Sequence, residues 1–357
     1  MANKINVAVI FGGNSSEHDV SLVSAYNVIK NIPTEKYDIT CVGITKKGAW
    51  LYYPGSYENI PDGSWESNPD CTHCILSVDT IHKGFIMLDN GNYYYRKIDV
   101  IFPVLHGKNG EDGTIQGMFE LSQIPYVGCG VLASACCMDK AFTHMILEQN
   151  GVKTAKFETV LYADVLNLES EIDRVEKNIT YPMFVKPANA GSSIGISKAN
   201  NREELLKAIH LAFAHDTKVV IEETIVGRET EVAVFGFNDL IASVPGEIET
   251  VSTYDFYDYK AKYEDKSTIL HIPADFDDVT VKKLQDTAKK AYKAMGCQSL
   301  SRCDFFVLEN GEVILNEINT LPGFTPISMY PKLMNEIGID YSTLLDNLIT
   351  DAIEKRG

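Results

Sequence analysis

The chain has 357 residues, and at about 150 residues per domain this length predicts two or three domains with a sizeable buried core. Hydrophobic residues make up 45% and charged residues 23% of the chain, which excludes a disordered or a fibrous protein. Lysine and arginine number 32 against 49 aspartates and glutamates, so the net charge of −17 argues against nucleic acid or an anionic membrane surface as a partner.

The hydropathy pattern predicts a cytoplasmic protein. No stretch approaches the roughly 18 to 20 consecutive apolar residues that span a bilayer, and the apolar run 7–11 is too short for the core of a signal peptide. The eight cysteines are then expected to be reduced thiols, because disulfides are rare in that compartment.

The first part of the chain alternates strand-like and helix-like segments. Strands are predicted over 5–11, 37–44 and 99–105, and helices over 20–29 and 114–121. The first strand runs into Gly12-Gly13, a glycine loop before a helix. This alternation favours a parallel α/β sheet with functional loops at the carboxyl ends of its strands, and the segment 50–95 is interpreted as a peripheral excursion.

The remaining chain divides into two further units. A helix is expected to begin after the N-cap residue Asp139 and to end at Gly151. A small α+β unit follows, with strands over 156–161, 183–186, 195–198 and 219–223 and a helix over 202–214. The last unit has strands over 231–237, 247–251, 305–308 and 313–318 and a helix over 280–295. We therefore predict three domains, over 1–137, 138–223 and 224–357.

The segment 301–319 predicts a β-hairpin around Asn310-Gly311, the strongest short-range hairpin signal. A two-residue turn would pair Glu309 with Glu312, and the same register places Asp304 opposite Glu317 and Arg302 opposite Asn319. Because side chains alternate between the faces of a strand, these last four residues are expected on one face.

Two carboxylates facing each other at this distance destabilise a sheet unless a positive charge neutralises them. Asp304, Glu317 and Asn319 offer oxygen ligands, which is the set that Mg²⁺ prefers. The alternative is a solvated carboxylate pair partly neutralised by Arg302, and a one-residue bulge would change the register. Gly323 follows in a Pro-Gly turn, where backbone N–H groups are open to a ligand.

A second candidate site is the small-residue loop after Lys186. Its glycines, with Ser192 and Ser193, could hold phosphate oxygens beside the lysine charge, although the loop matches neither the P-loop nor the dinucleotide-binding pattern. An ordinary hairpin loop is the alternative. The strand that ends near Glu222 could present backbone groups to adenine, and Glu229 could accept hydrogen bonds from ribose. The alternative is a surface strand end with solvated glutamates.

Five segments carry motifs that recur together in one family. They are FGGNSSEHDVS at 11–21, LHGKNGEDGTIQG at 105–117, KPANAGSSIG at 186–195, FYDYKAKY at 256–263 and NEINTLPG at 316–323. In this order they resemble the D-alanine:D-alanine ligases of the ATP-grasp superfamily. The resemblance implies an N-terminal parallel α/β domain, a small central lid domain and a larger C-terminal domain. It also implies a homodimer that uses ATP to join two D-alanines for peptidoglycan precursors, through an acyl phosphate.

The resemblance also assigns roles to individual residues. The metal, Mg²⁺ or alternatively Mn²⁺, is assigned to Asp304, Glu317 and Asn319. ATP is assigned to Lys140, Lys186, Ser193, Glu222, Glu223, Ile225, Glu229 and Lys262. The amino-acid substrates are assigned to Glu17, His106, Arg302, Gly323, Ser328 and Met329. Catalytic roles are assigned to Glu17, Ser192, Arg302, Ser328 and Tyr263, the last on a closing loop over 254–266.

The second substrate is the finer question. Relatives that make D-alanyl-D-lactate replace the closing-loop Lys-Tyr with histidine, whereas this chain has Lys262-Tyr263. Relatives that make D-alanyl-D-serine often carry arginine in place of Met329 and an acidic residue in place of Gly246. D-Alanine is therefore the expected second substrate and D-serine the alternative. A nucleotide-binding protein without catalysis is disfavoured by the presence of the metal ligands, Arg302 and the closing loop. Another ATP-grasp ligase is disfavoured by Glu17 and the loop segment 257–263.

Overall fold

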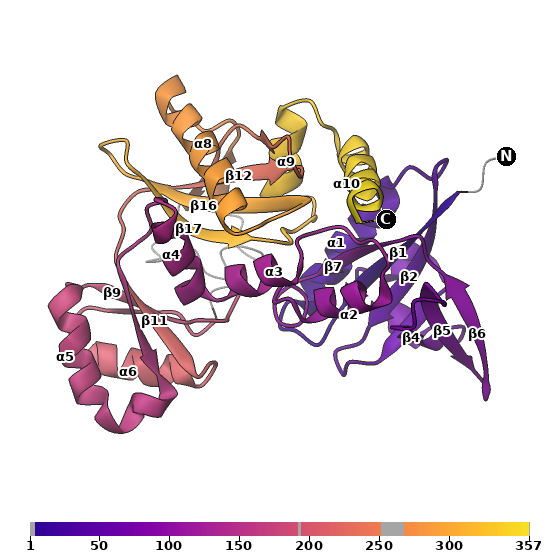
Figure 1. Cartoon of the computed structure of the whole chain (residues 1–357), viewed down its shortest axis with the longest axis horizontal. Helices are drawn as coiled ribbons and strands as arrows, with labels where there is room; N and C mark the ends of the chain where they lie inside the picture. The colour runs from indigo at the N-terminus through magenta and orange to yellow at the C-terminus, as the bar shows by residue number, and fades with distance from the viewer. Residues whose placement is uncertain (1–3, 192–193, 251–267, 357) are drawn as a thin grey trace.

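The computed structural model describes residues 4–191, 194–250 and 268–356. Its strands form three sheets, of seven, four and six strands, which follow one another along the chain. Figure 1 shows the three sheets around a central region that is crossed by helices α3 (Val131–Met138) and α4 (Lys140–Gln149). Each of the three predicted domains contains one sheet, whereas the domain boundaries themselves stay a prediction.

The seven-stranded sheet has the order β6-β5-β4-β3-β2-β1-β7. Its parallel part consists of β1 (Ile5–Gly12), β2 (Tyr37–Ile44) and β7 (Val100–Leu105), as predicted. The excursion adds antiparallel strands β3 (Trp50–Tyr53), β4 (Thr72–Leu76), β5 (Gly84–Asp89) and β6 (Asn92–Lys97), with short 3₁₀ turns at Tyr57–Asn59 and Ser64–Ser67. This segment therefore lies at one edge of the sheet, which agrees with its interpretation as a peripheral excursion, and its strands extend the same sheet.

Helices cover both faces of this sheet. Helix α1 (His18–Asn31) and the C-terminal helix α10 (Tyr341–Arg356) pack on the face that carries Val7, Val9 and Phe11. Helix α2 (Thr114–Ser122) packs on the opposite face. The two ends of the chain therefore share one hydrophobic core, and the sequence pattern did not indicate this contact.

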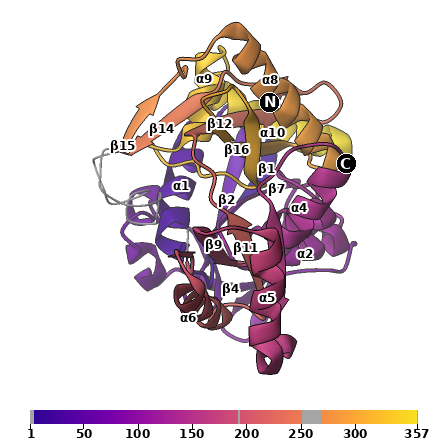
Figure 2. The same ribbon diagram turned by 90° about the vertical axis from the view of Figure 1, so that its left-hand side faces the viewer.

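The four-stranded sheet has the order β10-β9-β11-β8 and is antiparallel. Its strands are β8 (Phe157–Leu161), β9 (Met183–Pro187), β10 (Ser197–Ala199) and β11 (Lys218–Glu223). A 3₁₀ helix at Tyr162–Asn167 leads into α5 (Leu168–Asn178), and α5 and α6 (Arg202–Phe213) lie against one face (Figure 2). Met183, Val185 and Ile221 point into that helix-covered core, so alternation turns Phe184, Lys186 and Glu222 to the other face.

The third sheet contains β15-β14-β12-β16-β17, with β13 paired to β12. Its strands are β12 (Arg228–Phe235), β13 (Ile241–Ala242), β14 (Gly246–Thr250), β15 (Thr268–His271), β16 (Leu300–Val307) and β17 (Val313–Asn319). Helices α8 (Asp278–Ala294) and α9 (Met329–Glu336) pack against it. Among the described residues, no helix is both long and apolar enough to cross a bilayer.

The β16–β17 hairpin has the predicted pairing of the site residues, although its turn and its register near the turn differ from the prediction. Near the turn, Val307 pairs with Val313, which is one residue out of the predicted register. The turn is longer than predicted, and Gly311 adopts φ +74° within it. A bulge between Asp304 and Phe305 leaves Asn316 as the extra residue of β17 and restores the register. Asp304 therefore faces Glu317, and Arg302 faces Asn319, as the sequence predicted.

The start of α4 also agrees with its prediction. The Asp139 side chain accepts hydrogen bonds from the backbone N–H groups of Ala141 and Phe142, at 3.1 and 3.2 Å. It also contacts Lys218 on β11. This cap fixes the first residue of α4, Lys140, beside the four-stranded sheet.

Candidate active site

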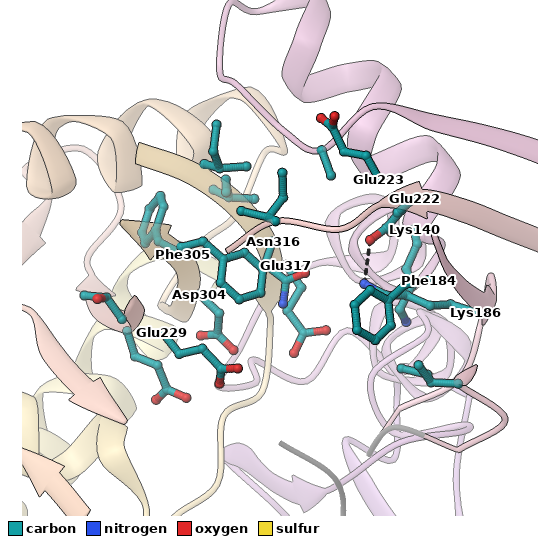
Figure 3. A pocket seen from close by; sticks show the side chains of 18 of the residues that line it. Lys140, Phe184, Lys186, Glu222, Glu223, Glu229, Asp304, Phe305, Asn316 and Glu317 are labelled. Carbon is teal, nitrogen blue, oxygen red and sulfur yellow. Dashed lines mark hydrogen bonds and ion pairs between the residues drawn. The ribbon is translucent and has the colours of Figure 1, made fainter. Parts of the chain in front are cut away.

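A deep pocket lies between the four-stranded and the six-stranded sheet, which we call the intersheet pocket (Figure 3). It contains about 1110 Å³ of space, part of it open to solvent. Its apolar walls include Phe184 and Phe305. Its predicted site residues are Lys140, Lys186, Glu222, Glu223, Ile225, Glu229, Asp304 and Glu317. An apolar pocket with a few convergent charges is the usual form of a ligand site.

One wall of the intersheet pocket carries a buried chain of polar contacts. The Lys186 ammonium lies 2.6 Å from Oε2 of Glu222, and Figure 3 shows both side chains at the four-stranded sheet. The other oxygen of Glu222, Oε1, lies 2.9 Å from Nε2 of His144 on α4. Burial alone would raise the pKa of Glu222, but Lys186 and His144 outweigh burial and lower it far below its ordinary value. Glu222 is therefore held as a carboxylate.

A second cation, Lys140, enters from the N-terminus of α4. Its ammonium donates a hydrogen bond of 2.7 Å to the carbonyl oxygen of Ala190, in the loop after β9. Burial lowers the pKa of Lys140, and the nearby Lys186 adds to this effect, while Glu317 opposes it. Two partly buried lysines thus line one region, which suits a ligand with several negative charges.

Three carboxylates form a row on the facing sheet. Glu231 on β12 pairs with Asp304 on β16, and Asp304 pairs with Glu317 on β17, so all three project from one face. Arg302 donates two hydrogen bonds of 2.7 Å to Asp304, and its Nε lies 2.9 Å from Glu231. Burial opposes the charge of Arg302, but Asp304 and Glu231 raise its pKa well above the ordinary value.

The carboxylate row suits a divalent cation that is also coordinated by water and by substrate phosphates. Among the described residues, no group of three His, Cys, Asp or Glu side chains could hold a metal alone. The Asn319 amide instead lies 3.0 Å from Asp304 and 3.4 Å from Glu317, so three oxygen-bearing side chains converge. Turning this amide about its last bond would present its oxygen in place of its nitrogen. Two carboxylates and an amide suit Mg²⁺, which completes its shell with water and substrate phosphates.

A smaller pocket adjoins the first, and we call it the polar pocket. It is lined by Glu17, His106, Glu111, Arg302, Asn319 and Gly323 among others. Lys140, Ala190 and Glu317 line both pockets. A ligand group at this junction therefore meets the carboxylate row, the partly buried Lys140 and Arg302 together.

The Glu17 carboxylate lies close to the backbone of two glycines. A β-carbon added at Gly107 would lie 2.2 Å from Oε2 of Glu17, and one added at Gly191 would lie 3.1 Å from the same atom. Gly107 also has φ +70°, a conformation that favours glycine. The two glycines thus let Glu17 lie between the loop after β7 and the loop after β9.

His106 lies at the carboxyl end of β7, where parallel sheets place functional loops. Its Nδ1 lies 3.6 Å from Glu111, and its Nε2 lies 3.2 Å from the Ser24 hydroxyl. Burial opposes protonation of the ring, but Glu111 and then Glu17 outweigh it and raise the pKa of His106.

The turn after β17 holds the last predicted substrate residues. Gly323 lines the polar pocket, and a β-carbon there would lie 2.8 Å from the Ser328 hydroxyl. That hydroxyl also accepts a 3.0 Å hydrogen bond from the backbone N–H of Thr325. Met329 lines neither pocket but packs in the core, where a β-carbon at Gly246 would lie 2.8 Å from its sulfur.

Two protein-family models match the chain: "D-ala D-ala ligase N-terminus" over residues 6–129 and "D-ala D-ala ligase C-terminus" over residues 146–350. The chain belongs to this ligase family. The D-alanine–D-alanine ligase of Acetivibrio thermocellus is 48% identical, over 99% of this chain and 97% of that protein. The ligase of Caldicellulosiruptor bescii is also 48% identical, over 99% and 96%.

Solved structures agree with this membership. The VanG D-Ala:D-Ser ligase of Enterococcus faecalis aligns with a TM-score of 0.90 at 45% identity, over 98% of this chain and 100% of that one. The D-alanine–D-alanine ligase of Coxiella burnetii aligns with a TM-score of 0.84 at 31% identity, over 99% and 95%. The ATP-grasp architecture predicted from the sequence motifs is thereby confirmed.

Most predicted residues of this ligase site lie at its two pockets, and several further residues were missed. Ser192, Ser193, Lys262 and Tyr263 lie outside the described residues, so their roles stay predictions. Glu231, His144 and Glu111 were not predicted. The alternation Glu229, Glu231 along β12 was the available signal for the first of these.

Proposed function

We propose that this protein joins two D-alanines into D-alanyl-D-alanine, at the expense of ATP, through a D-alanyl phosphate. One observation supports this proposal above the others: the intersheet pocket and the smaller polar pocket meet at Lys140 and Glu317. A phosphoryl group at this junction can be attacked by a carboxylate that enters from the polar pocket. The relatives named as D-alanine–D-alanine ligases, at 48% identity, support the choice of substrate.

In this proposal the intersheet pocket binds ATP. Adenine packs between apolar residues such as Phe184 and Phe305, near the backbone of Glu223 and Ile225, and Glu229 accepts hydrogen bonds from ribose. Lys140 and Lys186 lie on the phosphates, because two partly buried ammonium groups are stabilised by such an anion.

Two members of the carboxylate row, together with Asn319, would hold the metal. Asp304, Glu317 and Asn319 are the proposed ligands for Mg²⁺, with Mn²⁺ as the alternative, since both prefer oxygen donors. When bound, the cation would neutralise charge on the transferring phosphoryl group. Arg302 supports the site by offsetting the charge of Asp304 and Glu231, which otherwise repel the triphosphate.

The polar pocket places the amino acids. Glu17 accepts hydrogen bonds from the ammonium of the first D-alanine, with His106 beside it, and this orients the substrate carboxylate toward the γ-phosphate. Attack by that carboxylate forms the acyl phosphate and releases ADP. The amine of the second D-alanine then attacks the acyl carbon, and phosphate leaves.

The tetrahedral step develops a negative oxygen. Arg302 and the backbone N–H of Gly323 are the proposed donors to it, with Ser328 beside Gly323, and one such donor is worth about 10²- to 10³-fold in rate. Ser192 and Tyr263 are proposed to complete the closed site over Glu17, which keeps water from the acyl phosphate. The position of Met329 in the core makes its proposed role indirect, through the helix that Ser328 begins.

The test is phosphate release by the purified protein with Mg²⁺, ATP and D-alanine, with products separated by mass. We expect phosphate and D-alanyl-D-alanine in equal amounts, and release that depends on all three additions. Phosphate release that is independent of D-alanine, with no dipeptide, would contradict the proposal.

D-Serine is the second candidate for the second substrate, and the 0.90 TM-score of the VanG D-Ala:D-Ser ligase favours it. The Gly246–Met329 contact favours D-alanine, because no charged pair is present where D-serine relatives are expected to carry one. Incubation with equal D-alanine and D-serine separates the two candidates by the mass of the dominant dipeptide.

We also propose that the protein acts in the cytoplasm as a homodimer. The location follows from the precursors that the dipeptide serves, and the dimer from the family resemblance. Sedimentation at micromolar concentration tests the dimer, since a single species with the mass of one chain would exclude it.

A further inference from the structure

Helix α4 contributes a second polar residue near the intersheet pocket, one turn after Lys140. His144 follows Lys140 by four residues, so both side chains lie on the same face of the helix. The imidazole is 2% exposed and stacks on Phe157 of β8, with ring centroids 4.7 Å apart and an interplanar angle of 22°. Its polar atoms are therefore out of contact with bulk water.

The imidazole makes one polar contact of note. Nε2 lies 2.9 Å from Oε1 of Glu222. Within the described part of the chain, Nδ1 has no hydrogen-bond partner. A carboxylate held ionised accepts hydrogen bonds and cannot donate them, so Nε2 must carry the proton. The contact with Glu222 is therefore the only hydrogen bond that the imidazole makes among the described residues.

Glu222 also contacts Lys186, the lysine that is proposed to bind the phosphates. Its Oε2 lies 2.6 Å from the ammonium of Lys186, and the two strands place both side chains on the pocket face. Lysine has a flexible stem with large rotamer freedom, so an anchored carboxylate restricts where its ammonium can lie. Glu222 is anchored only if its other oxygen is also held.

We propose that His144 is a positioning residue, which holds Glu222 and through it orients Lys186 toward the ATP phosphates. This inference rests on the proposed function, since it needs ATP in the intersheet pocket. In this proposal one face of α4 carries Lys140, which contacts the phosphates itself. The same face carries His144, which orients Lys186 through Glu222.

The variants His144→Gln and His144→Asn form a matched test pair. The glutamine amide nitrogen can take nearly the place of Nε2 and still donate to Glu222, whereas the asparagine amide reaches only about as far as Nδ1. Both changes remove the stacking on Phe157, so a packing role would affect them equally. The readouts are the Kd of a non-hydrolysable ATP analogue with Mg²⁺, the KM values for ATP and D-alanine, and thermal unfolding.

We expect His144→Asn to weaken analogue binding on the order of tenfold, as for a lost hydrogen bond to a charged group. The KM for ATP should rise by a similar factor, and the KM for D-alanine should change less than about twofold. His144→Gln should recover most of the affinity. Equal losses in both variants, in step with their unfolding temperatures, would show packing alone and overturn the proposal.

A double variant tests the route through Lys186. In a Lys186→Met background, His144→Asn should have no further effect on analogue binding, because the residue that it positions is gone. An undiminished effect in that background would overturn the proposed route. If the wild type binds the analogue but makes no dipeptide, only the proposed function is wrong; if it binds no nucleotide, both are wrong.

Discussion

Substituting Gly107 by alanine should displace the Glu17 carboxylate and weaken D-alanine binding specifically. The added β-carbon would lie 2.2 Å from Oε2 of Glu17 and 2.9 Å from the Ser15 hydroxyl. Ordinary contact begins at 3.4 Å, so the carboxylate must move by about 1 Å. The carboxylate is the far end of a side chain and can move, but it is buried among the groups that would orient the substrate.

The magnitude has two parts. Alanine at φ +70° costs roughly 1 to 2 kcal/mol of folding stability, because a β-carbon is strained there. A shift of about 1 Å in a substrate-positioning group can lower kcat/KM by as much as about 10²-fold. We therefore expect the KM for D-alanine to rise by about 10- to 100-fold, while the KM for ATP stays within about twofold, since Gly107 does not line the intersheet pocket.

The matched control is Gly296→Ala, because Gly296 has φ +67° and no atom within 4 Å of an added β-carbon. Both variants should lose similar stability in thermal unfolding, so any difference between them reports on Glu17. Initial rates with D-alanine varied at saturating ATP, and the reverse, separate the two KM values. If Gly107→Ala and Gly296→Ala have the same KM for D-alanine, the assignment of Glu17 to the substrate is refuted.

Three further predictions concern the metal, the polar pocket and a helix cap. Asp304→Asn should lower kcat by about 10²- to 10³-fold and raise the Mg²⁺ concentration needed for half-maximal rate, measured by Mg²⁺ titration; an unchanged titration would argue against this ligand. The folded-state pKa of His106 is raised above its ordinary value, so its contribution to stability should be complete below about pH 6.5 and lost as pH rises through the folded pKa. Denaturant unfolding from about pH 5.5 to about pH 8.5 measures this, and Glu111→Gln should flatten the profile. Asp139→Ala should cost about 0.5 to 2 kcal/mol of stability by removing the α4 cap; a smaller change in chemical denaturation would contradict the cap's role.

The hairpin illustrates what the sequence could and could not predict. Asn310-Gly311 located the turn, and alternation placed Asp304 opposite Glu317 correctly. The turn length was wrong by one residue, and the bulge at Asn316 offset that error, so the correct pairing depended on two compensating irregularities. Bulges are set by sheet twist and by neighbouring strands, which a local pattern does not contain.

Most of the missed features are long-range. Helix α10 shares a core with β1 although the two lie at opposite ends of the chain, and no local periodicity reveals such a partner. The role proposed for His144 depends on its contact with Glu222, 78 residues further along the chain. Glu231 likewise becomes a site residue through its contact with Arg302 on the adjacent strand. Most site residues in motifs were found, whereas residues that act through a long-range contact required the structure. Glu111 is the exception, since it lies in the motif at 105–117 and contacts His106 in the same segment.

The most direct test of the central claim follows oxygen from D-alanine into phosphate. The protein is incubated with ATP, Mg²⁺ and D-alanine labelled with ¹⁸O in its carboxylate, and the released phosphate and the dipeptide are examined by mass spectrometry. An acyl phosphate formed at the junction of the two pockets predicts one ¹⁸O in each released phosphate, while the new peptide carbonyl retains the other ¹⁸O of that carboxylate. Dipeptide formed with unlabelled phosphate would contradict the account, because the carboxylate would then not have attacked the γ-phosphate.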